Sequence, residues 1–183
     1  MSESGDEVEA DGRSAVADEG AAVSSRRALF AVVGLCFVPM TVVDSGGAGV
    51  TLVTLWGFLN TSGGAVPTGV QLYPVWSFFL DGSLPFGVLP DSIRVWPVAL
   101  GFHLLAVASA AGGVVFGRED RRVTGGLLVL GALASLWITM GVAGRFGVGR
   151  TVGWLAVLPT GAVATLVVAL AGYGRDLREG LRR

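Results

Sequence analysis

The sequence lacks lysine altogether, and charged residues of any kind make up only 15% of its 183 residues. All 13 basic side chains are arginines, which occur in short clusters beside apolar segments and form no continuous basic face. We therefore expect no nucleic-acid partner. Hydrophobic residues make up 52% of the chain. A soluble domain of this size has too few polar residues left to cover its surface at that composition. The composition predicts a protein whose partner is the lipid bilayer.

Cysteine and histidine occur once each, as Cys36 and His103. A single cysteine inside an apolar run excludes a disulfide framework within the chain and a multi-cysteine metal site. The apolar runs also hold no pair of carboxylates, so a proton-coupled pump or an ion pathway lacks its usual groups. The sequence predicts neither a bound metal nor a cofactor.

Four apolar runs predict transmembrane helices. Residues 95–116, 123–144 and 152–173 each give about 33 Å of helix, enough to cross a hydrocarbon core of about 30 Å. Residues 28–43 give only about 24 Å, so this helix needs the glycine-rich turn that follows, and we place its end near residue 47. The predicted fold class is an all-α integral membrane protein, a bundle of four transmembrane helices over residues 26–175.

The segments outside these runs differ in character. Residues 1–25 hold half of the acidic residues among Ser, Gly and Ala, which predicts a disordered acidic cytoplasmic tail. Residues 176–183 form a short basic tail. Residues 48–94 are aromatic and apolar, but their runs are too short to span or are broken by Pro67 and Pro74. We predict an external lid at the membrane surface, with residues 50–80 either re-entrant or interfacial.

The aromatic side chains of this lid are expected at the headgroup level, where amphipathic rings are enriched. They are Trp56, Tyr73, Trp76, Phe78, Phe79, Phe86 and Trp96.

The arginines set the predicted orientation, because positive charge near helix ends stays in the cytoplasm. Ten of the 13 arginines fall on one side of the predicted bundle, and Arg94, Arg145 and Arg150 fall on the other. Those that determine the topology are Arg26, Arg27, Arg118, Arg121, Arg122, Arg175 and Arg178. The prediction is a multi-pass protein of the plasma membrane with both termini in the cytoplasm.

Three short motifs invite a functional interpretation but lie in the wrong context. Residues 25–30 look like a twin-arginine export signal, yet further apolar runs follow, so positive-inside anchors are favoured. Residues 144–151 fit a phosphate-binding loop except that Arg150 replaces its lysine, and they are predicted to join two spans outside. Residues 158–161 resemble a cell-wall sorting signal, but Pro159 there is better explained as a helix kink inside the bilayer.

Cys36 and His103 lie in the first two predicted spans, at depths that differ by only ~6 Å. They are residue types that membrane-embedded transpeptidases use, with the histidine holding the thiol as a thiolate. In the alternative interpretation Cys36 is an inert small hydrophobe and His103 hydrogen-bonds to Thr139 or Ser135 of the third span.

Three stretches, residues 50–60, 89–97 and 117–130, carry a resemblance to a known family. The chain resembles the small haloarchaeal membrane proteins that are named for being encoded near archaeosortase A. The resemblance covers most of residues 28–173 and departs in a long N-terminal extension. It implies a haloarchaeal source, which fits the missing lysine and the acidic tail, and a membrane location. It implies no activity and no catalytic residue.

The leading functional hypothesis is a non-enzymatic accessory protein that packs against another membrane protein, such as a component of surface-protein anchoring machinery. Small residues at helical spacing, such as Ala106 and Ala110, favour close helix contacts. Two alternatives stay open. One is a membrane-embedded thiol enzyme that uses Cys36 and His103. The other is a small transporter or lipid-binding bundle in which Asp44, His103 and the lid line a cavity.

Overall fold

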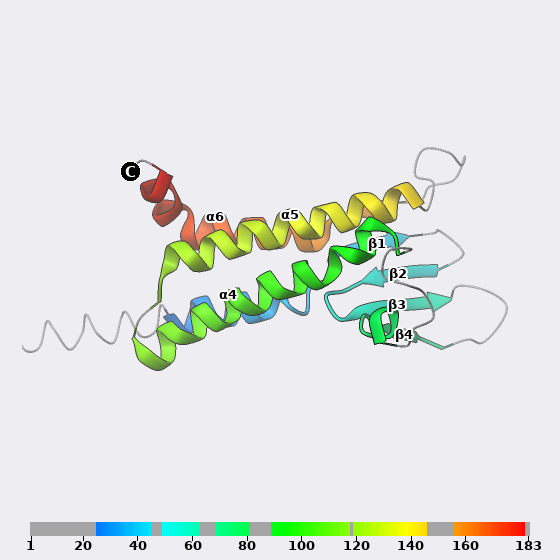
Figure 1. Ribbon diagram of the computed structural model, residues 1–183, viewed down its shortest axis with the longest axis horizontal. Helices are drawn as coiled ribbons and strands as arrows, with labels where there is room; N and C mark the ends of the chain where they lie inside the picture. Colours follow the sequence, from blue (N-terminus) through cyan, green and yellow to red (C-terminus); the bar gives the residue numbers. More distant parts are fainter. Residues whose placement is uncertain are drawn as a thin grey trace, which may run out of the picture.

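A layer of helices and a small β-sheet lie end to end in this protein (Figure 1). The structure is a computed structural model, and it describes residues 25–44, 49–62, 69–80, 89–117, 119–145 and 156–181. The helices of the layer are residues 25–35, α4 (Trp96–Phe116), α5 (Arg121–Arg145) and α6 (Thr160–Leu181). Two short helices, α2 (Ser77–Leu80) and α3 (Asp91–Arg94), contact β4 and α5, respectively.

The sheet has five antiparallel strands in the order β4-β3-β2-β1-β5. The strands are β1 (Thr41–Asp44), β2 (Gly49–Val53), β3 (Gly57–Ser62), β4 (Gln71–Pro74) and β5 (Ala156–Leu158). Along β1, Thr41 and Val43 are buried whereas Val42 and Asp44 face outward, which is the alternation expected of a strand with one covered face. β5 comes from a distant part of the chain and pairs with β1, so the fifth strand joins the sheet through a long-range contact.

The predicted all-α bundle of four transmembrane helices is wrong, because two of the four apolar runs are partly strand. In the first run the helix ends at residue 35, and β1 follows after Pro39. Proline has no backbone N–H and disfavours helical geometry in the residue before it, and the β-branched residues that follow favour a strand. In the fourth run β5 precedes Pro159, which separates that strand from α6 and does not kink a helix.

The predicted lid is also largely sheet. Within residues 48–94, the described part forms β2, β3 and β4 with the short helices α2 and α3. Trp56, Tyr73 and Trp76 are exposed, as a position at a membrane surface requires, but Trp96 is buried at 1% exposure. Phe86 and the Phe78 side chain lie outside the described residues, as does the predicted acidic tail apart from Ser25.

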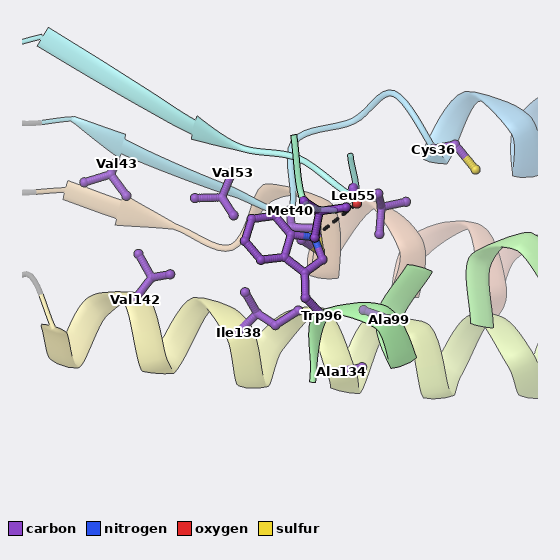
Figure 2. Packing of buried hydrophobic residues seen from close by; sticks show 11 residues of the cluster. Cys36, Met40, Val43, Val53, Leu55, Trp96, Ala99, Ala134, Ile138 and Val142 are labelled. Carbon is purple, nitrogen blue, oxygen red and sulfur yellow. Dashed lines mark hydrogen bonds between the residues drawn. The ribbon is translucent and has the colours of Figure 1, made fainter. Parts of the chain in front are cut away.

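Two buried apolar clusters hold the molecule together. The first lies between the sheet, the start of α4 and the later turns of α5, and it includes Met40, Val43, Val53, Leu55 and Ile138 (Figure 2). The second lies between the helices, and it includes Val32, Ala106, Leu128, Ala169 and Tyr173. Each burial of an aliphatic side chain contributes roughly 1.5–3 kcal/mol where water is the alternative solvent. The first cluster fixes the sheet against the end of the helical layer.

Trp96 is the largest side chain in the junction between the two parts. Its Nε1–H donates to the Leu55 carbonyl oxygen at 3.1 Å, the bond that Figure 2 draws as a dashed line. Its ring meets Phe58 edge to face, with centroids 4.8 Å apart and planes at 83°. Such aromatic pairs prefer this geometry because the positive ring edge meets the negative ring face. Trp96 therefore ties the start of α4 to β3 and to the loop before it.

The pairing of β5 with β1 gives the sharpest test of this fold. In a Cys36→Ala background, Val42→Cys and Leu158→Cys should form a disulfide on mild oxidation, because these residues are partners on adjacent strands with Cα atoms about 5 Å apart. The crosslink is checked by mass spectrometry of the linked peptides.

The matched control is Val42→Cys with Leu59→Cys. Leu52 pairs with both Val42 and Leu59, so Leu59 lies in the same row two strands away, which is about 10 Å and too far for a disulfide. Equal crosslinking of the two pairs, or of neither, would contradict the strand order.

Candidate functional site

The helical layer carries large apolar side chains on its outer surface, and its interior holds several polar side chains beside the apolar cluster. Its exposed large apolar residues include Leu104, Leu105, Val115 and Phe116 of α4, Leu133, Trp137 and Met140 of α5, and Val163, Val167 and Leu170 of α6. Its buried polar residues include His103, Thr124, Ser135, Thr139 and Thr165. A protein in water has the opposite preference, because each exposed apolar patch costs free energy.

His103 is the centre of the buried polar set. It lies on α4 with 3% exposure, and its Nδ1 is 2.8 Å from the Ala99 carbonyl oxygen. Because that oxygen can only accept, Nδ1 carries the proton and donates to it. Nε2 is 3.2 Å from Thr165 Oγ1 of α6, so in the neutral ring it accepts from the threonine hydroxyl. The imidazole thus links α4 to α6.

Gly131 of α5 makes room for this ring. A Cβ placed on Gly131 would lie 2.9 Å from Cε1 and 3.0 Å from Nδ1 of His103, closer than a carbon atom can pack without movement. The absence of a side chain on Gly131 therefore lets α5 pack against α4 over the imidazole.

Two further hydroxyl pairs link other elements. Ser109 of α4 bonds Thr124 of α5 at 2.7 Å between their Oγ atoms. Thr41 of β1 bonds Thr139 of α5 at 2.5 Å. Thr139 also donates to the Ser135 carbonyl oxygen at 2.9 Å, so its two contacts are satisfied without His103. The prediction that His103 bonds Thr139 or Ser135 is wrong, since its partner is Thr165.

The structure does not join Cys36 to His103. Cys36 follows the helix at 25–35, is 5% exposed and packs in the apolar cluster beside the sheet (Figure 2). Its backbone oxygen accepts from Trp56 Nε1 at 2.9 Å. Both ring nitrogens of His103 are engaged by other groups, and neither has Cys36 as its partner. An apolar site favours the neutral thiol over the thiolate, and the described hydrogen bonds of His103 do not support the predicted pairing with Cys36.

Asp44 ends β1 at the sheet, whereas His103 lies in the second turn of α4, among the helices. The described residues do not bring these two side chains to one cavity. Within the same residues, no group of three His, Cys, Asp or Glu side chains is arranged to hold a metal ion.

The predicted topology residues gather at the end of the helical layer that lies away from the sheet (Figure 1). That end carries the start of the helix at 25–35, the turn from α4 to α5 and the last turns of α6. The arginines there are Arg26, Arg27, Arg121, Arg122, Arg175 and Arg178. Arg118 lies outside the described residues.

Two helices, residues Asp91–Phe116 and Arg121–Gly144, are long and apolar enough to cross a membrane. The core helix of a soluble protein can meet the same criterion, but such a helix is mostly buried. Here, in the most apolar 18-residue stretch of each helix, only 28% and 44% of the residues, respectively, are buried within the protein. Both helices therefore leave more than half of the residues of these stretches outside the buried interior.

The chain matches, over residues 9–183, a family described as a domain of unknown function (DUF8050). It therefore belongs to this family. A search of curated proteins finds none that matches the chain. The family description names no activity and no source, so the haloarchaeal source and the link to archaeosortase stay predictions.

Sequence reasoning missed Thr165, Glu119 and Tyr173 as interior polar residues. Thr165 lies four residues after Gly161 within an apolar run, a spacing typical of a helix face that packs closely. Glu119 lies among charged residues in the short segment between two apolar runs and looks like an ordinary loop residue. No pattern in the sequence indicates that its side chain turns inward.

Two glycines of α5 allow a matched test of the His103 packing. Gly131→Ala should destabilise the protein by about 1–3 kcal/mol, because the added methyl group overlaps the imidazole. Gly126→Ala meets no atom within 4 Å and should be neutral or stabilising by up to about 1 kcal/mol, since alanine favours a helix. Thermal unfolding of the purified proteins in one detergent measures both. A Gly131→Ala protein as stable as wild type would contradict the packing.

Proposed function

We propose that the protein is a non-catalytic accessory protein of a membrane, with its helical layer in the bilayer and its sheet at the outer surface. The observation that carries the membrane assignment is the inverted distribution of side chains. Leu133, Trp137, Met140, Val167 and Leu170 are each more than half exposed, while the histidine and hydroxyl groups of the same helices bond to one another inside. Hydrocarbon is the solvent that suits such a surface.

The two ends of the helical layer support an orientation. Arginines cluster at the end away from the sheet, and positive charge is retained in the cytoplasm. At the opposite end Trp56 and Trp76 are 37% and 53% exposed, a position that suits rings at a headgroup boundary. This orientation puts the N-terminal helix start and the end of α6 on the cytoplasmic side, in the plasma membrane.

An accessory role suits the sheet better than catalysis does. β4 pairs with β3 along one edge, and among the described residues no strand pairs with its other edge. Val70, Leu72 and Tyr73 on and beside this strand are 64%, 63% and 50% exposed. An apolar edge strand is a template for a strand of another chain. We assign the contact with another membrane protein to this edge, and call Val70 and Leu72, which lie on one face of the strand, the β4 surface.

A pair of lysine substitutions tests the membrane location. Leu133 on α5 and Leu72 on β4 are 58% and 63% exposed. If α5 lies in the bilayer, Leu133→Lys should cost about 2.5–3.5 kcal/mol of insertion free energy and lower the amount of protein in carbonate-washed membranes. Leu72→Lys should leave that amount unchanged, because the proposal places β4 outside the bilayer.

For a protein in water, both substitutions would be neutral to about 0.5 kcal/mol, since both sites are exposed. Equal membrane levels for the two variants, or release of the wild-type protein by carbonate, would therefore refute the membrane location.

The Leu72→Lys variant also tests the accessory role. Affinity purification of wild type in a mild detergent should yield a membrane protein in a fixed stoichiometry, and Leu72→Lys should lose it, because a buried charge at an interface without a partner is costly. Gln71→Lys, which adds the same charge on the other face of the strand, is the control and should lose less. Wild type that purifies without a partner, or a partner that Leu72→Lys retains, would contradict the role of the β4 surface.

A further inference from the structure

One face of the sheet carries a row of aliphatic side chains that crosses every strand. Figure 2 shows Val43 and Val53 between the strands and α5, on the covered face. Val42 lies on the opposite face, because successive residues of a strand alternate, and paired residues of antiparallel strands share a face. The strand register then gives one row on the uncovered face, which we call the outer row: Leu158 of β5, Val42 of β1, Leu52 of β2, Leu59 of β3 and Leu72 of β4.

The outer row is exposed along its length. Leu158 and Leu72 at its two ends are 52% and 63% exposed, and the three residues between them are partly exposed. An antiparallel sheet with one face on a core has polar side chains on its other face when that face meets water. Five aliphatic side chains over a distance of about 19 Å form an apolar patch instead, which marks a contact surface.

Hydrocarbon does not cover the outer row if the membrane lies where we propose. Trp56 Nε1 donates to the Cys36 carbonyl oxygen at 2.9 Å, so Trp56 marks the end of the sheet that is nearest the helices. Leu59 lies three residues farther along β3, a distance of about 10 Å. With Trp56 at the headgroup boundary, the outer row lies beyond that boundary. Its partner is therefore a protein surface.

The outer row lies at a single height above the proposed membrane. The strands run nearly along the axes of α4 and α5 in both views (Figures 1 and 2), so a row across the strands runs parallel to the membrane. Two copies inserted in the same direction are related by an axis along the membrane normal, which keeps every residue at its height. The outer row of one copy can therefore meet the outer row of another. This step rests on the proposed membrane location.

We propose that the outer row is the interface between two copies of this chain, packed sheet against sheet. β2 is the middle strand of the five, so the two-fold axis passes Leu52 and sets it against Leu52 of the second copy. Val42 then faces Leu59 of the second copy. Leu158 faces Leu72 of the second copy at each end of the row. Every contact along the row joins two aliphatic side chains.

The neighbouring row on the same face agrees with an axis at β2. There Asp44 pairs with Val50, which pairs with Thr61. The axis sets Val50 against its own copy and Asp44 against Thr61 of the second copy, so the two carboxylates do not meet. An axis at β1 would bring the two Asp44 side chains together, and like charges at an interface are costly. The free edge of β4 stays open to a strand of the partner protein.

Chemical crosslinking in native membranes tests the dimer. The sheet face covers roughly 300 Å² per copy, less than the roughly 800 Å² of complexes that persist in dilute solution, and confinement in a membrane compensates for this. In a Cys36→Ala background, Leu52→Cys should give a covalent dimer with a short bifunctional thiol reagent. A disulfide is not expected, because packed sheets keep their backbones about 10 Å apart. Gel mobility and mass spectrometry of the linked peptides identify the product.

The ends of the row give the matched control. Leu72→Cys is at an exposed site and reacts, but two such residues lie about 19 Å apart along the row, so this variant alone should give no dimer. Coexpression of Leu72→Cys and Leu158→Cys chains with different tags should give a dimer that carries both tags. Equal dimer from Leu52→Cys and from Leu72→Cys alone, or no dimer from the mixed chains, would overturn the proposed packing.

A charge at the axis gives a second measurement. Leu52→Lys should abolish the crosslink between the Leu72→Cys and Leu158→Cys chains, because it buries two like charges between the sheets. Gln71→Lys adds the same charge on the covered side of β4, at an exposed site, and should leave the crosslink in place. A crosslink that survives Leu52→Lys would contradict the interface. If Leu52→Lys folds poorly, the cysteine variants alone decide the question.

Failure of this inference is distinct from failure of the proposed function. A wild-type protein that stays in carbonate-washed membranes, with cysteine variants that give no dimer, refutes the dimer alone. Capture of a different protein by Leu52→Cys would assign the outer row to that protein and refute the second copy. A wild-type protein that carbonate releases refutes the membrane location, and with it the axis along the membrane normal.

Discussion

The buried indole of Trp96 sets how the two parts of this protein meet. Its N–H bonds the Leu55 carbonyl, and its ring packs edge to face on Phe58. Both partners belong to the β2–β3 region, whereas Trp96 begins α4. The direction in which α4 leaves the sheet follows from this contact, α5 packs on α4, and α6 packs on α5. The junction at Trp96 therefore sets where the helical layer begins relative to the sheet.

The interior of the helical layer uses hydrogen bonds for specificity. Ser109 with Thr124, His103 with Thr165 and Thr41 with Thr139 link three different pairs of elements. For the proposed bilayer location, such bonds contribute on average about 0.6 kcal/mol each, and packing at small residues such as Gly131 would supply much of the remaining association. Apolar contacts alone would leave the rotation of each helix poorly defined. The position of each hydroxyl fixes which faces meet.

Hydropathy predicted α4 and α5 to within about two residues because both runs are long, uninterrupted and bounded by charge. It failed for the first and fourth runs, since apolarity does not distinguish a strand from a helix in a short segment. Pro39 and Pro159 were the available signals that the helices are interrupted in these two runs. The pairing of β5 was not predictable from local sequence, because its partner β1 lies far away in the chain. The burial of His103 was predictable from its place in an apolar run. Its partner was not, because α4 is apolar around most of its circumference and gives no sign of which face meets α6.

The pairing of β5 with β1 imposes an order on assembly. β1 is made early, and more than one hundred residues follow before its second neighbour exists. During synthesis, the side of β1 that will pair with β5 stays unpaired while β2 to β4, α4 and α5 are produced. Non-local strand pairing of this kind is slow. α6 begins two residues after β5, so the strand that completes the sheet and the helix that follows it are produced together. A chain cut short before Ala156 would lack β5 and leave the backbone N–H and C=O groups along one side of β1 unpaired, available to a strand of another chain.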